Sequence, residues 1–145
     1  MIKDQSDILF PVVGFGPIAL DADTTPVAID LGGNEAATIL IAVGVGGVTF
    51  SAENKIDFEV THCDTAAGDY TAVLAADVQG VTPATGGVVL SLVAAHAAAT
   101  VTKVGYIGRK QYLKIKANFA GTHGGTTPIC VLVVKGRARS VAIPS

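Results

Sequence analysis

Three reactive residue types stand side by side where the sequence reads His62-Cys63-Asp64. Neighbouring side chains on a strand point to opposite faces, so His62 and Cys63 cannot act together as base and nucleophile. His62 follows Phe58 and Val60 at two-residue spacing, which predicts a hydrogen-bonded histidine at the edge of the core. We therefore expect no catalytic residue and no enzymatic activity.

Candidate ligands for ions and cofactors are equally sparse. The three histidines and two cysteines are too scattered to give the spacing of a zinc site. Asp57 and Glu59 share one face of an expected strand, where a solvated acidic face is favoured over a Ca²⁺ site completed by a turn residue. The glycine cluster at residues 44–47 is followed by the β-like residues 48–50, whereas a phosphate site would need a helix N-terminus there. We expect neither a metal nor a cofactor.

The apolar pattern that would position these residues is that of strands. Residues 55–63 alternate between apolar and polar, as in a half-buried strand. Residues 37–43 and 129–134 are continuously apolar, which predicts central strands covered on both faces. Residues 100–107 and 111–118 flank a connection of hairpin length. Further short strands are expected at residues 8–15, 25–31, 70–74 and 87–93.

About eight strands at short, regular spacing are typical of an all-β sandwich or jelly roll. We expect a single such domain over residues 1–145, with extended arms at residues 1–15 and 137–145 that are free to reach a neighbour. The predicted core residues are Ile39, Ile41, Ile56, Phe58, Val60, Leu113, Ile115, Val131 and Val133.

The composition indicates a protein that hides part of its surface. Half of the residues are hydrophobic and 15% are charged, against about 25% charged in an ordinary soluble domain. The segment Met1 to Asp7 is polar and no apolar run reaches the length of a membrane span, so we expect synthesis in the cytoplasm and no membrane partner. In that compartment Cys63 and Cys130 are expected to be small buried hydrophobes without a disulfide.

Charge is divided unequally along the chain. Residues 1–80 carry all 12 acidic groups and two lysines, a balance of −10, while the remaining residues carry eight basic groups and no acidic one. Either the two halves interleave and neutralise each other, or they form faces of opposite sign that dock copies together. The pI is about 5.8, and the segment of residues 135–139 has no aromatic residue that could stack on a base. We therefore expect no direct nucleic-acid binding. The candidate interface residues are Arg109, Lys110, Tyr112, Lys114, Lys116, Lys135, Arg137 and Arg139.

Two stretches, residues 55–73 and 103–121, resemble a pattern found in small virion proteins encoded among the head genes of tailed bacteriophages. The first stretch matches that pattern at Glu59, Asp64, Gly68, Tyr70 and Val73. The second matches it at Val104, Gly105, Tyr106, Ile107, Gly108, Arg109, Lys110, Tyr112 and Lys114. Cys63 stands where the pattern usually has Ser, and residues 65–67 lengthen the turn.

The resemblance implies a decoration, cement or minor head protein of the capsid, of jelly-roll type. It implies a location in the virion, the major capsid protein or other virion proteins as partners, and a homo-oligomer, with a trimer favoured. The alternative is a discoidin-like jelly roll that binds carbohydrate. Sugar-binding modules usually present aromatic platforms with Trp foremost, and this chain has no Trp.

Overall fold

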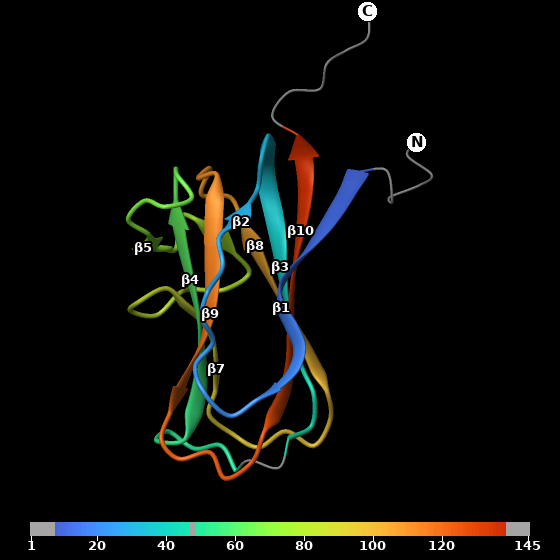
Figure 1. Ribbon diagram of the computed structural model, residues 1–145, viewed down its shortest axis with the longest axis vertical. Helices are drawn as coiled ribbons and strands as arrows, with labels where there is room; N and C mark the ends of the chain where they lie inside the picture. The colour runs from blue at the N-terminus through green and yellow to red at the C-terminus, as the bar shows by residue number, and fades with distance from the viewer. Residues whose placement is uncertain (1–7, 47–48, 139–145) are drawn as a thin grey trace, which may run out of the picture.

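The computed structural model describes residues 8–46 and 49–138, and these form two antiparallel sheets packed as a β-sandwich (Figure 1). We name them sheet A and sheet B. Sheet A contains, in spatial order, β1 (Leu9–Leu20), β10 (Thr127–Ala138), β3 (Asn34–Val43), β8 (Thr100–Tyr106) and β6 (Val78–Gln79). Sheet B contains β2 (Ile29–Asp30), β9 (Tyr112–Ala120), β4 (Lys55–Cys63) and β5 (Thr71–Ala72), with β7 (Val88–Leu92) also paired to β4.

The strand pairs are nested like a long hairpin that has been rolled up. β1 pairs with β10, β2 with β9, β3 with β8 and β4 with β7, all antiparallel. Because successive strands mostly alternate between the two sheets, the connections wrap around the core. This nesting is the topology of a jelly roll, so the predicted fold class is confirmed, with ten strands in place of about eight.

The core lies between the sheets and is built from alternating residues of their inner faces. All nine predicted core residues are buried, and Phe58 is fully enclosed on β4. The residues of β4 alternate strictly between buried and half-buried along its whole length, as the sequence predicts. Tyr106 is also buried (1% exposed), which makes it the largest side chain of the core.

Several predicted boundaries are wrong at the start and end of the chain. β1 continues beyond residue 15, where the predicted strand ends, because register shifts between Val13 and Phe15 and between Phe15 and Ile18 accommodate the glycines within the strand. Leu9–Leu20 therefore pairs with β10 along a strand that includes half of the expected N-terminal arm. The C-terminal arm is shortened too, because β10 extends to Ala138. Residues 1–7 and 139–145 of the expected arms lie outside the described residues.

The connection between β8 and β9 is a corner between the sheets, and the predicted hairpin is wrong. β8 pairs with β3 and β6 in sheet A, while β9 pairs with β2 and β4 in sheet B. Both strands turn their apolar residues toward the common core, so they face each other across the sandwich. The corner folds tightly over the ring of Tyr106: the Tyr106 hydroxyl accepts a hydrogen bond from Lys110 N (3.1 Å). A Cβ on Gly108 would lie 2.8 Å from that ring.

Candidate assembly interface

Five of the eight residues predicted to form an interface lie on β9 of sheet B or in the corner that leads into it. Tyr112, Lys114 and Lys116 alternate with the buried Leu113 and Ile115 on β9, so they lie on the outer face of sheet B. Arg109 and Lys110 stand in the corner that precedes β9. These five residues are brought together along one strand and its entry.

Their charges are largely neutralised within the chain. Lys110 Nζ lies 2.6 Å from Asp64 Oδ2, and Lys116 Nζ lies 2.9 Å from Asp23 Oδ2. The hydrogen bond from Lys116 lowers the pKa of Asp23 and raises that of Lys116. Both pairs join the basic second half of the chain to the acidic first half. They support the alternative in which the two halves interleave.

Lys114 and Lys135 use other partners. Lys114 Nζ lies 4.0 Å from the centroid of the Tyr70 ring, within the range of a cation–π contact. Lys135 belongs to β10 of sheet A, away from the β9 residues, and its Nζ donates to the carbonyl oxygen of Asp30 at 3.3 Å. Arg137 ends the same strand with a side chain outside the described residues, and Arg139 lies outside them altogether.

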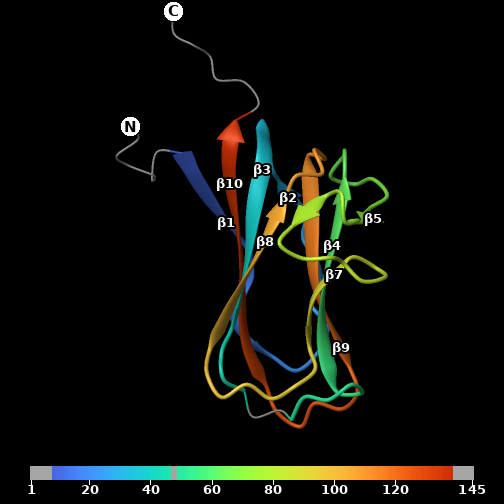
Figure 2. The same cartoon turned by 180° about the vertical axis from the view of Figure 1, so that it is seen from behind.

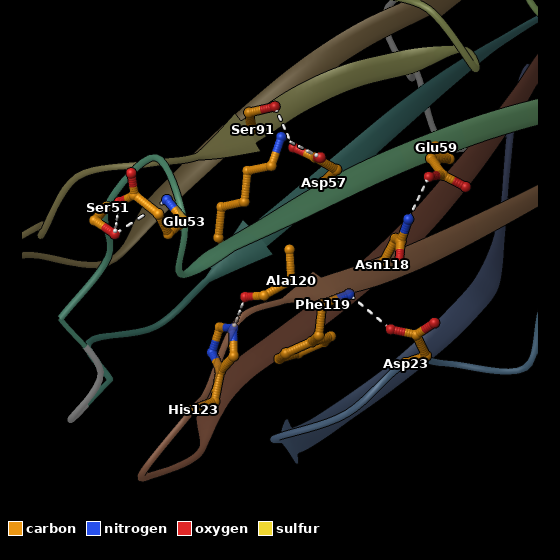
Figure 3. A network of polar contacts seen from close by, with 11 residues as sticks. Asp23, Ser51, Glu53, Asp57, Glu59, Ser91, Asn118, Phe119, Ala120 and His123 are labelled. Atoms are coloured by element: carbon orange, nitrogen blue, oxygen red, sulfur yellow. Dashed lines mark hydrogen bonds and ion pairs between the residues drawn. The ribbon is translucent and has the colours of Figure 1, made fainter.

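The outer face of sheet B is polar over its remaining length (Figure 3). Asp57 accepts a hydrogen bond from the Ser91 hydroxyl and forms an ion pair with Lys55 at 2.8 Å. Glu59 accepts a hydrogen bond from the Asn118 side chain at 2.7 Å. Each carboxylate of β4 is thus bound to a neighbour on the sheet surface. This face is built to contact water.

The outer face of sheet A has the opposite character. On β10 and β3 the buried residues alternate with half-buried ones that point away from the core. The cross-strand pairs Leu132–Leu40 and Val134–Thr38 lie on that outward side, and β1 and β8 extend it. We call this set the outer apolar face: Leu9, Pro11, Val13, Thr38, Leu40, Ala42, Val101, Lys103, Gly105, Cys130, Leu132 and Val134.

The described part of the chain leaves this face uncovered. Figures 1 and 2 show the strands of sheet A with sheet B on one side, and no described segment lies over the other side. Lys103 is the one charged residue of the set, while Val13 and Val101 are 57% and 68% exposed. Toward one end the face contains an apolar hollow of about 300 Å³, lined among others by Pro17, Ala42 and Cys130.

The sequence contains a signal for the outer apolar face, but that signal was interpreted as evidence of strands buried within the chain itself. Residues 37–43 and 129–134 were expected to be covered on both faces because they are continuously apolar. β3 and β10 are indeed central in sheet A, yet the described chain covers only their inner sides. The continuously apolar sequence of these two strands therefore indicates that something other than the described chain covers their outer sides. The interface was predicted at the basic residues of β9 because they are charged. These residues instead have partners within the chain.

His62 is buried (7% exposed) and hydrogen-bonded, as predicted. Its Nδ1 lies 2.9 Å from the Tyr106 hydroxyl, which already accepts a hydrogen bond from Lys110 N. The Nε2 atom of His62 lies 3.9 Å from Asp77 Oδ2. Burial lowers the pKa of His62, against the opposing effect of Asp77.

The cysteines do not lie in the core, so that prediction is wrong. Cys63 alternates with the buried His62 and Cys130 with the buried Val131, so both thiols point outward and are half-buried. Both are free, one on β4 of sheet B and the other on β10 of sheet A. Cys130 is part of the outer apolar face.

The other two histidines pack around Phe50 at the opposite end of the sandwich from His62. The His96 ring stacks on Phe50 at 5.8 Å, and the His123 ring meets it edge-on at 6.2 Å. Their Nε2 atoms lie 2.9 Å from the carbonyl oxygens of Gly44 and Ala120. These contacts close the end of the core, and residues 8–46 and 49–138 hold no cluster of three potential metal ligands.

No protein-family model, no curated protein and no solved structure matches this chain. Within the described part of the chain, no helix has the length and apolarity needed to cross a membrane.

Proposed function

We propose that this chain is a structural protein of a virion, which decorates or cements a bacteriophage capsid by associating with copies of itself and with the shell. The observation that carries the proposal is the outer apolar face, a sheet surface with one charged residue and no cover from the described chain. The resemblance in residues 55–73 and 103–121 implies the capsid as the location, the major capsid protein as the partner, and a homo-oligomer with a trimer favoured.

The size of the face supports assembly over a free monomer. β3 has 10 residues, which at about 3.4 Å each give a length of about 34 Å. Four strands about 4.8 Å apart give a width of about 19 Å, and hence an area of about 650 Å². The largest apolar patch of a typical monomer is about 300–600 Å² and usually serves to bind a partner.

The two sheets divide the work in this proposal. The outer face of sheet B holds its charges in pairs such as Lys116–Asp23 and suits contact with solvent. The outer face of sheet A suits contact with protein.

The aromatic residues favour this function over carbohydrate binding. A sugar platform needs exposed rings, and Tyr106 is enclosed in the core. Tyr70 is covered on one side by Lys114. Of the three tyrosines, only Tyr112 remains as a half-buried ring on the outer face of sheet B, where Gln111 Nε2 donates to its hydroxyl at 3.3 Å.

Density-gradient fractionation of cells that produce the protein tests the proposal. An antibody against the purified chain should detect it in the band of assembled particles, and quantitative mass spectrometry should find many copies per particle. A chain that stays wholly in the fractions of free protein would contradict a structural role in the virion.

A further inference from the structure

We infer that two copies of this chain pair face to face through their outer apolar faces, related by a two-fold axis near Leu40 and Leu132. This inference rests on the proposed function, in which self-association is one step, and it names the surface that makes the contact. It replaces the trimer by a contact in which the same face serves both partners.

The face, and not the sheet edge, is available for pairing. β1 is the edge strand of sheet A next to β10. Pro11 and Pro17 lie in β1 and lack the N–H that a new neighbouring strand would need. Two register shifts bend the strand further. Such features protect the β1 edge of sheet A against strand addition, which favours contact through the face beside it.

The area fits a stable pair. Two faces of about 650 Å² bury about 1,300 Å² together, within the range of about 1,200–2,000 Å² for specific protein interfaces. Two sheets that pack in this way lie about 10 Å apart. The pair would form a stack of four sheets, with the paired outer faces at its centre.

The chemistry of the face selects an apolar partner. Leu40 and Leu132 are cross-strand neighbours on two adjacent strands of sheet A, and Lys103, the one charged residue of the set, lies directly beside Leu40 on β8. The long apolar stem of a lysine can lie along an apolar surface while its ammonium group stays in water. A polar partner would lose its hydrogen bonds to water on the outer apolar face, because this face offers few side chains able to replace them. A second copy presents the same apolar face and has few such hydrogen bonds to lose.

The outer apolar face has exposed side chains at one end and a hollow at the other, and this shape suits a two-fold pair. Leu9 is 42% exposed at the end of the face where β1 begins. The hollow beside Cys130 lies at the other end, where β10 begins. A two-fold axis across the strands places the exposed Leu9 end of each copy over the hollow of the other. Each copy then fills the recess of its partner with apolar side chains.

The mass of the purified full chain in solution tests the inference. Light scattering at micromolar concentration should give about 29 kDa, twice the 14.6 kDa of the chain. Leu132→Lys sets two like charges near the axis and should weaken pairing by at least about 30-fold, the effect of losing about 2 kcal/mol at a hot spot. Leu74→Lys, at a 69% exposed position outside the face, is the matched control and should keep the double mass.

The cysteines provide a second measurement that needs no charged substitution. Cys130 should react slowly with a maleimide in the wild-type pair and several-fold faster in Leu132→Thr, a β-compatible variant whose fold is checked by circular dichroism. Cys63 lies on sheet B outside the contact. Its rate should be the same in both proteins, which makes it an internal control.

The outcomes separate this inference from the proposed function. A wild-type monomer, or a trimer of about 44 kDa, three times the chain mass, would overturn face-to-face pairing. So would a pair that survives Leu132→Lys with Cys130 still reactive. None of these results affects the presence of the chain in the particle band, which tests the virion role by itself. A double mass that Leu132→Lys abolishes and Leu74→Lys preserves supports the pair.

Discussion

At the scale of single residues, His62 shows which half of a polar contact can be predicted from sequence. Its two-residue spacing from Phe58 and Val60 places it on the inner face of β4, where the structure has it. Its partner Tyr106 is 44 positions away. Neither the burial of Tyr106 nor its bond to His62 could be predicted without knowing to which sheet β8 belongs.

The first prediction concerns the pH dependence of stability. Burial lowers the pKa of His62 below its ordinary value of 6.5, so the folded chain holds the ring neutral while the unfolded chain protonates it. The stabilisation is fully present above about pH 6.5 and is lost as pH falls through the folded-state pKa. Urea unfolding between about pH 5 and 8 should show a free energy of unfolding that declines below about pH 6.5.

The charged groups around His62 do not reverse this sign. Asp77 and Asp64 favour the protonated ring and Lys110 opposes it, yet burial remains the largest influence. In His62→Gln the decline assigned to His62 should disappear, although the variant is less stable at pH 7. A decline of the same size in His62→Gln would show that another group causes it.

The second prediction concerns Phe58, which is fully enclosed between the sheets. Phe58→Ala removes a large apolar side chain and leaves a cavity, so the free energy of unfolding should fall by about 3–5 kcal/mol. Leu74→Ala is the matched control, because Leu74 is mostly exposed and should change stability by at most about 0.5 kcal/mol. Urea titration followed by circular dichroism measures both, and equal effects would contradict the placement of Phe58.

At the scale of elements, the strands with clear apolar patterns were predicted best, and β7 lies within the predicted residues 87–93. β4 has the predicted bounds, and β3 and β10 contain the predicted apolar runs. β6 was missed, and residues 25–31 gave only the two residues of β2. Such short strands exist because neighbouring backbone offers hydrogen bonds, which a local pattern does not encode. The β8–β9 corner could not be predicted either, because loop length does not reveal a change of sheet.

The third prediction compares two adjacent glycines before β7. Gly86 and Gly87 both have positive φ, but a Cβ on Gly86 meets no atom within 4 Å, while one on Gly87 would lie 2.3 Å from the Val60 carbonyl oxygen. Gly86→Ala should cost about 1–2 kcal/mol through its backbone conformation. Gly87→Ala should cost about 1–3 kcal/mol more, because β7 must move away from β4.

Chemical denaturation of the two alanine variants measures this difference. The hydrogen bond from Val60 N to the Gly87 carbonyl (2.9 Å) connects the same two segments, so its loss accompanies the displacement in Gly87→Ala. Because the two variants carry the same substitution at neighbouring positions with similar φ, helix and strand propensities cancel in the comparison. Equal losses of stability would mean that the contact with Val60 is relaxed at no cost.

At the scale of the whole molecule, the unequal charge of the two halves is resolved by the fold. β4 from the acidic half lies beside β9 from the basic half, with Glu59 opposite Lys116 in the register. Rolling up the chain therefore places acidic and basic side chains side by side on sheet B. The outer face of sheet A carries apolar residues from the runs 37–43 and 129–134, which predicted strands covered on both faces. Sequence predicts both the charges and the apolar runs, but only the topology separates them onto two faces.

The last prediction follows from this separation. If pairing uses the outer apolar face, its dissociation constant should change little between 0.01 M and 1 M salt, although the Debye length falls from about 30 Å to about 3 Å. Pairing should also weaken on cooling, because the hydrophobic effect becomes smaller at low temperature. Sedimentation equilibrium at both salt concentrations and at two temperatures measures these effects. Exposed charge pairs between copies would behave in the opposite way: the dissociation constant would rise steeply with salt, and Lys110→Ala or Lys116→Ala would weaken the pair while Leu132→Lys left it intact.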